Sequence, residues 1–478
     1  MNDHTVSEQT LGNSTGNKVR MTYTEFLDNS RMTSFLYLLL FGVILASILD
    51  GMDFQMTAFA LPGIIGEFKI NPAQAGVIAS VTNVGLLVGA ILFSLLSDRI
   101  GRKKIFQWVL LTFAFGSFLS AIAPSFELLI IARVIAGLGI GAELVVGAAI
   151  LAEFAPRRYR HIFVASVPLV WSIGWLIAAL LSIWCIPAWG WRSIYWIGVV
   201  PALMIAGIRF FLPESIRWLL IRGRTEEAGK IINNLAHRAG MTNIELVPPP
   251  VIVNQVKLNF RQQLSILRTV QVQMYVLAFV YFCFYIENWG INAWLPTIFV
   301  QQGYTLARSF TFTLVIFTVV PFSHLFGTWF QDKIQRKWAI FWMVSAGTVL
   351  LVLFGMSLQY RWPVHVIVGV QLLQTLAVQG VMVILYTLTT ELFPTPVRSL
   401  GIGSVQSMGR FGAILGPFML GLLLQFGTEI SHIIYFFAAP LLVSAVLALF
   451  VIRFDPRQKT LEQINTEVEG EAVAAGGH

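Results

Sequence analysis

The chain has 478 residues, of which 56% are hydrophobic and only 12% are charged, and its mean hydropathy is +0.74. Water-soluble proteins carry about 25% charged residues, so the composition excludes a soluble multidomain protein and predicts that lipid covers much of the exterior. The net charge is +8, but in such a chain the placement of the charges matters more than their sum, and we expect no nucleic-acid partner. Cys185 and Cys283 each lie in an apolar run and are expected to be buried thiols rather than a disulfide.

Apolar stretches of about twenty residues predict twelve membrane-spanning helices. The first six are 34–60, 74–97, 104–122, 127–150, 162–184 and 193–212, and the last six are 272–299, 309–331, 338–356, 363–390, 399–424 and 431–452. The predicted fold is an all-α membrane protein with two six-helix bundles, 34–212 and 270–452. The flanking segments are a polar tail 1–33 without a signal peptide, a polar linker loop 213–269 that is not a domain, and a disordered tail 453–478.

The positions of lysine and arginine predict the orientation of the spans. Most of the 32 basic residues lie in the even-numbered loops and the two tails. The odd-numbered loops contain only Lys69, Arg192, Arg308 and Arg361. Because basic loops stay in the cytoplasm, we expect both termini to be cytoplasmic in a multi-pass protein of the bacterial inner membrane.

Two landmarks of the first half recur in the second. The loop Asp98–Lys103 ends the second span, and its counterpart Asp332–Lys337 ends the eighth. A Glu–Pro–Arg set with one internal spacing follows the fourth and the tenth spans: Glu153, Pro156 and Arg160, then Glu391, Pro394 and Arg398. Both landmarks recur at nearly the same interval and on the same side, which predicts a parallel duplication of a six-helix unit.

These motifs are similar to those of the major facilitator superfamily. Ser97–Lys104 resembles its loop between helices two and three, Arg133–Gly141 resembles the helix-four motif of its proton-coupled members, and Pro213–Leu219 resembles the segment after helix six in sugar and organic-ion porters. The resemblance covers about residues 30–455. It implies two six-helix halves that rock about a site near the midplane.

A finer resemblance concerns the substrate. Asp50–Asp53 (Asp-Gly-Met-Asp) is similar to the Asp-Gly-aromatic-Asp pattern of aromatic acid:proton symporters, which sialic acid and lactate carriers share; Met52 stands where an aromatic residue is usual. Sugar porters carry a Gln-rich signature in helix seven, whereas Tyr285–Trp294 lacks it. The resemblance therefore implies an organic acid rather than a sugar.

Charged residues inside the spans mark candidate working sites, because a charge in the hydrocarbon core is costly. Asp50 and Asp53 share a helix face, and Asp53 and Arg133 lie at the same depth, roughly 10 Å from the outer end. We expect an Asp53–Arg133 ion pair with proton coupling by the two carboxylates; the alternative is a static pair that fixes two helices together. Glu143, deep in the fourth span, is a second candidate protonation site.

Arg410 is the candidate substrate clamp. It lies near the midplane, about 18 Å from the cytoplasmic end of its span, and its planar guanidinium suits a carboxylate. Gln406 lies one turn earlier on the same face. The alternative is a structural pair with Glu287 of the seventh span, about 22 Å from the same side.

Three further sets could contact a substrate or a proton. A polar and aromatic stripe runs along the seventh span: Tyr281, Tyr285, Asn288 and Asn292. His324 in the eighth span lies where aromatic acid symporters, which the chain resembles, have a functional histidine; the alternative is a helix–helix hydrogen bond. We expect Trp171 and Trp175 to pack between helices.

A gate is predicted at the cytoplasmic ends of the helices. Asp98, Gly101, Arg102 and Lys103 form a tight turn whose acidic end can meet a basic partner or a helix amino terminus. The remaining gate residues are Asp332 and two latches, Glu153–Arg160 and Glu391–Arg398. Glycines 137, 139 and 141 are expected to allow close helix packing.

Together these features predict a proton-coupled symporter that imports a small organic anion, an aromatic or other monocarboxylic acid, as a monomer. The alternatives are a sialic acid or lactate carrier, a sugar or organic-cation porter, and a sensor that does not transport. The sequence has no phosphate-binding loop, zinc-binding His-Glu-x-x-His or nucleophile elbow. We therefore expect neither an enzyme nor ATP-driven transport, and no cofactor or metal.

Overall fold

A computed structural model describes residues 19–30, 32–200, 212–238, 244–248, 260–393 and 397–451. Within these ranges, 11 helices are long and apolar enough to cross a membrane. They match eleven of the predicted spans. The sixth, 193–212, falls largely on residues outside the described ranges.

The N half consists of residues 34–200. Its helices are α2 (Ser34–Phe68), α3 (Pro72–Ile100), α4 (Arg102–Ile122), α5 (Phe126–Phe154), α6 (Arg157–Trp189) and the short α7 (Arg192–Ile197). Asn71 and Gln74 form a capping box at the start of α3, with Pro72 at the first helical position. Such caps satisfy the free amides of a helix end that emerges from the membrane.

Glycine brings α3 and α5 into backbone contact. A Cβ at Gly137 would collide with the main-chain oxygen of Thr82, and one at Gly141 with that of Leu86. A Cβ at Gly139 would lie 2.6 Å from the main-chain nitrogen of Phe113 in α4. The predicted role of these glycines in close packing is confirmed.

The C half consists of residues 271–451. Its helices are α12 (Gln271–Gln301), α13 (Leu306–Phe317), α14 (Val320–Lys333), α15 (Arg336–Gln359), α16 (Val364–Gln379), α17 (Val381–Leu392), α18 (Arg398–Gln425) and α19 (Ile430–Val451). The eighth predicted span is the pair α13–α14, and the tenth is the pair α16–α17. The break between α16 and α17 falls at Gly380, whose main chain lies against Gly327 of α14.

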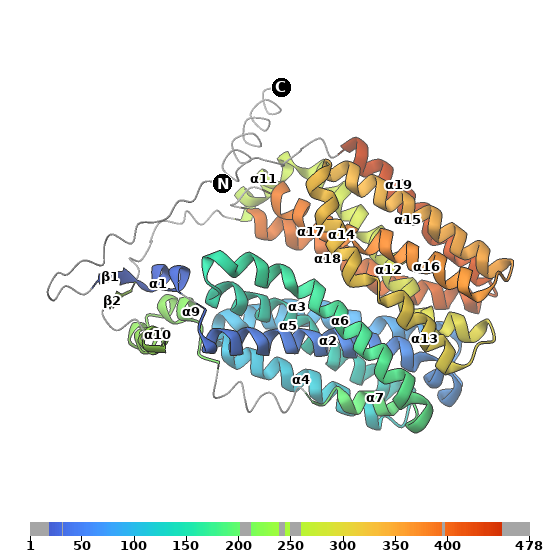
Figure 1. Cartoon of the computed structure of the whole chain (residues 1–478), viewed down its shortest axis with the longest axis horizontal. Coiled ribbons are helices and arrows are strands. Elements are labelled where there is room, and N and C mark those ends of the chain that lie inside the picture. Colours follow the sequence, from blue (N-terminus) through green and yellow to red (C-terminus); the bar gives the residue numbers. More distant parts are fainter. Residues whose placement is uncertain are drawn as a thin grey trace.

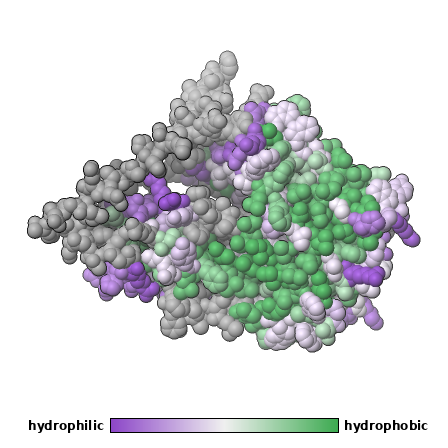
Figure 2. Space-filling view, in the orientation of Figure 1, coloured by the Kyte–Doolittle hydropathy of each residue, from purple (hydrophilic) through white to green (hydrophobic). Residues whose placement is uncertain are grey.

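The two halves lie side by side, with the N half below the C half in Figure 1. Figure 2 shows a broad hydrophobic surface over both halves, with hydrophilic residues gathered toward its two ends. Exposed apolar side chains of the two halves include Leu95, Phe322 and Trp342. Such a belt is the surface that a lipid bilayer requires.

The Lys- and Arg-rich loops lie at one end of the helices, which we call the basic end; the other is the opposite end. At the opposite end the halves are in direct contact. A Cβ at Gly421 of α18 would collide with the main-chain oxygen of Pro72, and one at Gly76 of α3 would lie 2.9 Å from that of Pro417.

A small folded unit at the basic end differs from the loop that the sequence predicts. The tail strand β1 (Val19–Thr22) pairs in parallel with β2 (Ile244–Val247) of the linker. Around them lie α1 (Tyr23–Asn29), α9 (Ile216–Ile221) and α10 (Thr225–Arg238), to the left in Figure 1. A further linker helix, α11 (Phe260–Thr269), precedes α12.

Buried side chains explain why this unit folds. Tyr23 and Phe26 of α1 share one apolar cluster with Ile232 and Leu235 of α10. The amphipathic helix α10 is too short to span a membrane and covers its apolar face with the tail instead. Linker and tail therefore form one unit, although about 200 residues separate them in sequence.

Candidate substrate and proton sites

A fully buried ion pair joins α2 and α5. Nη2 of Arg133 lies 2.7 Å from Oδ2 of Asp53, and both side chains are 0% exposed. The prediction that these residues meet is confirmed. Buried ions require additional hydrogen bonds to offset the loss of hydration, and the surrounding residues provide them for Asp53 Oδ1 and Arg133 Nε.

Three neighbours hold the pair in place. Ser117 Oγ donates a hydrogen bond of 2.7 Å to Asp53 Oδ1, and Arg133 Nε donates one of 3.3 Å to Thr82 Oγ1. The guanidinium also lies 5.0 Å from the ring of Tyr195. The pair is therefore enclosed on both the acidic and the basic side.

Asp50 lies close to two other acidic groups. Its charge interacts with that of Asp53 on the same helix face, as predicted, and with that of Glu143 of α5. The side chains of Asp50 and Glu143 are 0% and 1% exposed, and Ser47 Oγ donates to Glu143 Oε1 at 3.5 Å. Two adjacent buried carboxyl groups share a proton far more readily than they carry two negative charges.

Aromatic rings fill the space between the halves. Phe54 lies 4.7 Å from Trp289 of α12 and 5.5 Å from Trp171 of α6, measured between ring centroids. Trp175 lies 5.7 Å from Trp289 and 5.2 Å from Phe317 of α13. The predicted packing of Trp171 and Trp175 is confirmed at 6.0 Å, and it extends across both halves.

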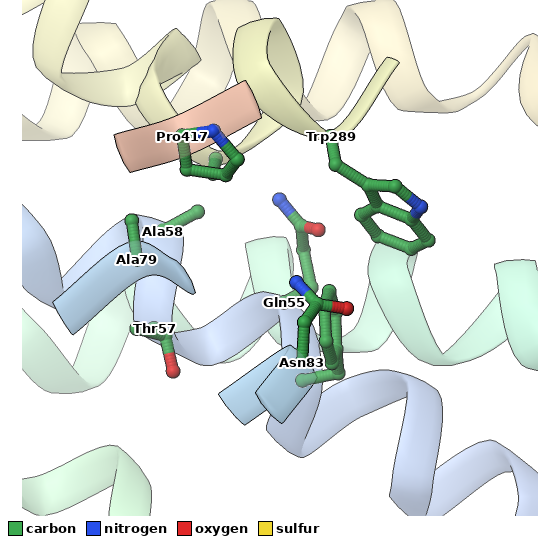
Figure 3. Close-up of a pocket in the computed structure, with 9 residues that line it drawn as sticks. Gln55, Thr57, Ala58, Ala79, Asn83, Trp289 and Pro417 are labelled. Atoms are coloured by element: carbon green, nitrogen blue, oxygen red, sulfur yellow. The ribbon is translucent and has the colours of Figure 1, made fainter. Parts of the chain in front are cut away.

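A cavity of about 10 Å³ lies next to this aromatic layer (Figure 3). Gln55 and Asn83 extend from the N half into it, toward Trp289 of the C half. Gln55 Nε2 donates to the carbonyl of Asn292 at 3.4 Å, and Asn83 Nδ2 donates to the carbonyl of Ala413 at 3.2 Å. This volume holds about one water molecule, so the halves are in contact here and leave little space between them.

Gln55 and Asn83 are not among the predicted site residues. Both are amides inside otherwise apolar helices, and both are buried, at 2% and 1% exposure. That contrast is the signal that would have found them, because a polar side chain in a span has to find a partner within the protein.

Arg410 of α18 lies beside a cluster of tyrosines. The rings of Tyr281 and Tyr285 are 6.0 Å apart, and Tyr386 of α17 lies 6.5 Å from Tyr281. Arg410 interacts electrostatically with Tyr285, and Gln406 is hydrogen-bonded to Tyr281. Within the described part of the chain, Arg410 forms no ion pair.

Glu287 does not pair with Arg410, so that structural alternative is wrong. Glu287 Oε1 accepts a hydrogen bond of 2.8 Å from Gln374 Nε2 of α16. Gln374 Oε1 in turn accepts one of 3.0 Å from Gln371 Nε2. The carboxyl of Glu287 therefore faces the interior of the C half.

Three further predicted residues of the C half, on α12 and α14, are buried. Asn288 and Asn292 are 6% and 4% exposed, and His324 is 7% exposed. Neither ring nitrogen of His324 has a hydrogen-bond partner among the described residues. The adjacent Ser323 Oγ donates to the carbonyl of Leu376 at 2.6 Å, which fixes this part of α14 against α16.

Each half carries an equivalent ion pair at the basic end. Arg102 Nη1 lies 3.0 Å from Glu153 Oε1 in the N half, and Arg336 Nη1 lies 2.5 Å from Glu391 Oε2 in the C half. In each pair the arginine belongs to the first repeated landmark and the glutamate to the second. The duplication seen in the sequence is therefore a duplication of this contact.

Glu153 and Glu391, the acidic residues of the predicted latches, pair with Arg102 and Arg336. Arg398 Nε donates to the carbonyl of Phe393 at 3.2 Å, and the predicted Glu391–Arg398 latch stays a prediction. The side chain of Arg160 lies outside the described residues. Asp332 is exposed at the end of α14.

Glu214 caps the start of α4, which is one of the two kinds of contact predicted for Asp98. Its Oε1 accepts hydrogen bonds from the amides of Arg102 and Lys103 at 2.8 and 3.0 Å. A carboxylate is favourable at a helix amino terminus. Gly101 permits this contact, because its φ is +114° and a Cβ would lie 2.6 Å from Glu214 Oε2.

Comparison with known proteins agrees with this architecture. Residues 23–468 match the family described as "Sugar (and other) transporter". The chain belongs to this family of the major facilitator superfamily. This confirms the predicted fold class, a membrane protein with two six-helix halves. The family consists of carriers rather than enzymes.

Its relatives include carriers of small acids. The niacin transporter NiaP of Acinetobacter baylyi is 30% identical over 92% of this chain and 98% of its own. The 4-hydroxybenzoate transporter PcaK of the same organism is 26% identical over 89% and 93%. The inward-open xylose transporter XylE of Escherichia coli has the same fold, with a TM-score of 0.71 at 16% identity over 90% of this chain and 99% of its own.

Proposed function

We propose that this transporter carries an aromatic monocarboxylate into the cell together with protons. The observation that carries the proposal is Arg410, a partly buried guanidinium beside Tyr285 that forms no ion pair among the described residues. A carboxylate supplies the missing charge through two parallel hydrogen bonds. Aromatic faces of the tyrosines suit a flat ring. Relatives named for niacin, benzoate and 4-hydroxybenzoate transport support the same class of cargo.

The proton route in this proposal lies in the N half. Asp50 and Glu143 are the adjacent carboxyl groups, and the neighbouring Asp53 is neutralised by Arg133. Opening of the halves toward one side or the other changes the hydration of these groups, and with it their proton affinity. The basic end is cytoplasmic in this scheme, following the positive-inside rule.

Uptake into proteoliposomes under an imposed pH gradient tests the proposal. We expect accumulation of labelled nicotinate and benzoate, and none of xylose or of an organic cation. Arg410→Lys keeps the charge but loses the planar pair of donors, and should weaken affinity about 10- to 100-fold. The matched control is Arg308→Lys at an exposed position. Unchanged affinity in Arg410→Lys, or indifference to the pH gradient, would refute the assignment.

A further inference from the structure

Glu287 has no role in the mechanism described so far. Of the residues that the structure describes, it is the one buried carboxyl group of the C half, with 1% of its surface exposed. It lies about 24 Å along α12 from the basic end. A buried ionisable group inside a carrier marks a working site by default.

The polar surroundings of Glu287 consist of amides. Gln374 donates to Oε1, while Oε2 of Glu287 has no hydrogen-bond partner in the described part of the chain. Gln371, which continues this chain of hydrogen bonds, likewise has an unpartnered buried Oε1. Both unpartnered atoms are hydrogen-bond acceptors. The site therefore lacks a hydrogen-bond donor rather than an acceptor.

Among the described residues, none of the charged groups on the surrounding helices forms an ion pair with Glu287. The acidic groups are on α2, and the basic or titratable groups are on α13, α16, α18 and α19: Asp50, Asp53, Glu67, Arg308, His365, Arg398, Arg410 and His432. The hydrogen bond that the structure shows for the carboxyl of Glu287 in this part of the chain comes from Gln374. An ionised carboxylate buried without a counter-ion is strongly disfavoured.

We propose that Glu287 is a second proton-binding site and that each half of the carrier moves one proton. The hydrogen on Glu287 supplies the donor that the site lacks. The inference rests on the proposed function, in which Asp50 and Glu143 carry the other proton. One monoanion moved with two protons transfers one net positive charge, whereas one proton would leave transport electroneutral.

The net charge makes the proposal measurable on the wild-type protein. Proteoliposomes with equal pH inside and outside receive a potassium diffusion potential of 100 mV, negative inside. A net charge of one then raises the steady-state accumulation of labelled nicotinate roughly 50-fold. Accumulation that ignores the potential, while still responding to a pH gradient, would overturn the second proton and leave the proposed function intact.

Glu287→Gln tests the residue itself, because the amide keeps the hydrogen bond from Gln374 but cannot release a proton. We expect uptake driven by a pH gradient to remain and the response to the potential to disappear. Glu127→Gln, at an exposed position in α5, is the matched control and should behave as wild type. Should Glu287→Gln fail to fold, Glu287→Met replaces the carboxyl with an apolar chain of similar length.

Two other outcomes contradict the proposal. A wild-type response to the potential in Glu287→Gln would show that the carboxyl never releases its proton. If the substitution weakens nicotinate but not benzoate and leaves the potential response unchanged, Glu287 contacts the ring nitrogen of the cargo instead. If the wild-type protein transports none of the carboxylates, that result refutes the proposed function as well as this inference.

Discussion

The side chain of Asp53 is joined to that of Arg133 by a contact of 2.7 Å in which neither side chain is exposed. A second acid–arginine pair, Glu67–Arg192, lies at the carboxyl end of the same helix α2, with a contact of 2.6 Å. Its side chains are 45% exposed for Glu67 and 30% exposed for Arg192. The two pairs have similar chemistry and differ mainly in burial. Comparing the two pairs therefore shows how burial changes the contribution of an ion pair to the stability of the protein.

Asp53→Asn should destabilise the protein by about 3–5 kcal/mol, because it leaves Arg133 charged and unpaired in a dry site. Glu67→Gln should cost at most about 1 kcal/mol, since solvent screens that pair. Thermal unfolding in detergent measures both.

We further expect Asp53→Asn to retain substrate exchange but to lose uphill uptake. Equal stability losses in the two variants would contradict the role of burial, and normal uphill uptake in Asp53→Asn would exclude that residue from coupling.

Gly101→Ala should destabilise the turn between α3 and α4 for two reasons. An alanine at φ +114° is strained by about 1–2 kcal/mol, and its Cβ would press on Glu214, which caps α4. Gly190 is the control, because its φ is +78° and a Cβ there meets nothing within 4 Å. The difference between Gly101→Ala and Gly190→Ala in unfolding temperature isolates the Glu214 contact; no difference would mean that the cap contributes nothing.

Much of the architecture was predictable because lipid imposes a strict rule on sequence. Each span has to be apolar and about twenty residues long, so eleven of the predicted spans match described helices. The Asp53–Arg133 pair was predictable from depth alone, since two charged residues at one level in a bundle have few other partners.

Contacts that depend on how helices rotate and cross were not predictable. Asp50 and Asp53 share one helix face. Asp50 nevertheless interacts with the carboxyl group of Glu143, whereas Asp53 forms an ion pair with Arg133. Glu214 reaches the start of α4 from a segment more than 100 residues later. Neither partner follows from spacing within a single helix.

The tail unit at the basic end should detach when its core is removed. Phe26 is 2% exposed, within an apolar cluster that α1 and α10 share with α9 and with the membrane helices of the N half, and Phe26→Ala should cost that cluster about 3–5 kcal/mol. Hydrogen exchange should then lose protection in β1 and α1 while the membrane helices stay protected. The control is Tyr37→Ala, which removes an aromatic ring that is 60% exposed. Retained protection in Phe26→Ala would show that strand pairing alone holds the tail.

Closure of the opposite end should depend on Gly421. Its Cα faces the main chain of Pro72 so closely that any side chain would collide. Overpacking of this kind costs about 1–3 kcal/mol, which lowers the population of the closed arrangement roughly 5- to 150-fold. Gly421→Leu should therefore expose cysteines introduced at the ends of α3 and α18 to a membrane-impermeant reagent, and it should slow transport.

The control for Gly421→Leu is Gly427→Leu, two residues beyond the end of α18, where no atom lies within 4 Å of a built Cβ. Gly427 has a φ of +79°, so its substitution reports backbone strain near the same helix end without a collision between the halves. If both variants label and transport alike, the contact between α3 and α18 does not control access. If only Gly421→Leu changes labelling, the two glycines separate helix-end strain from closure, and the packing of Gly421 on Pro72 is the contact that has to break when the opposite end opens.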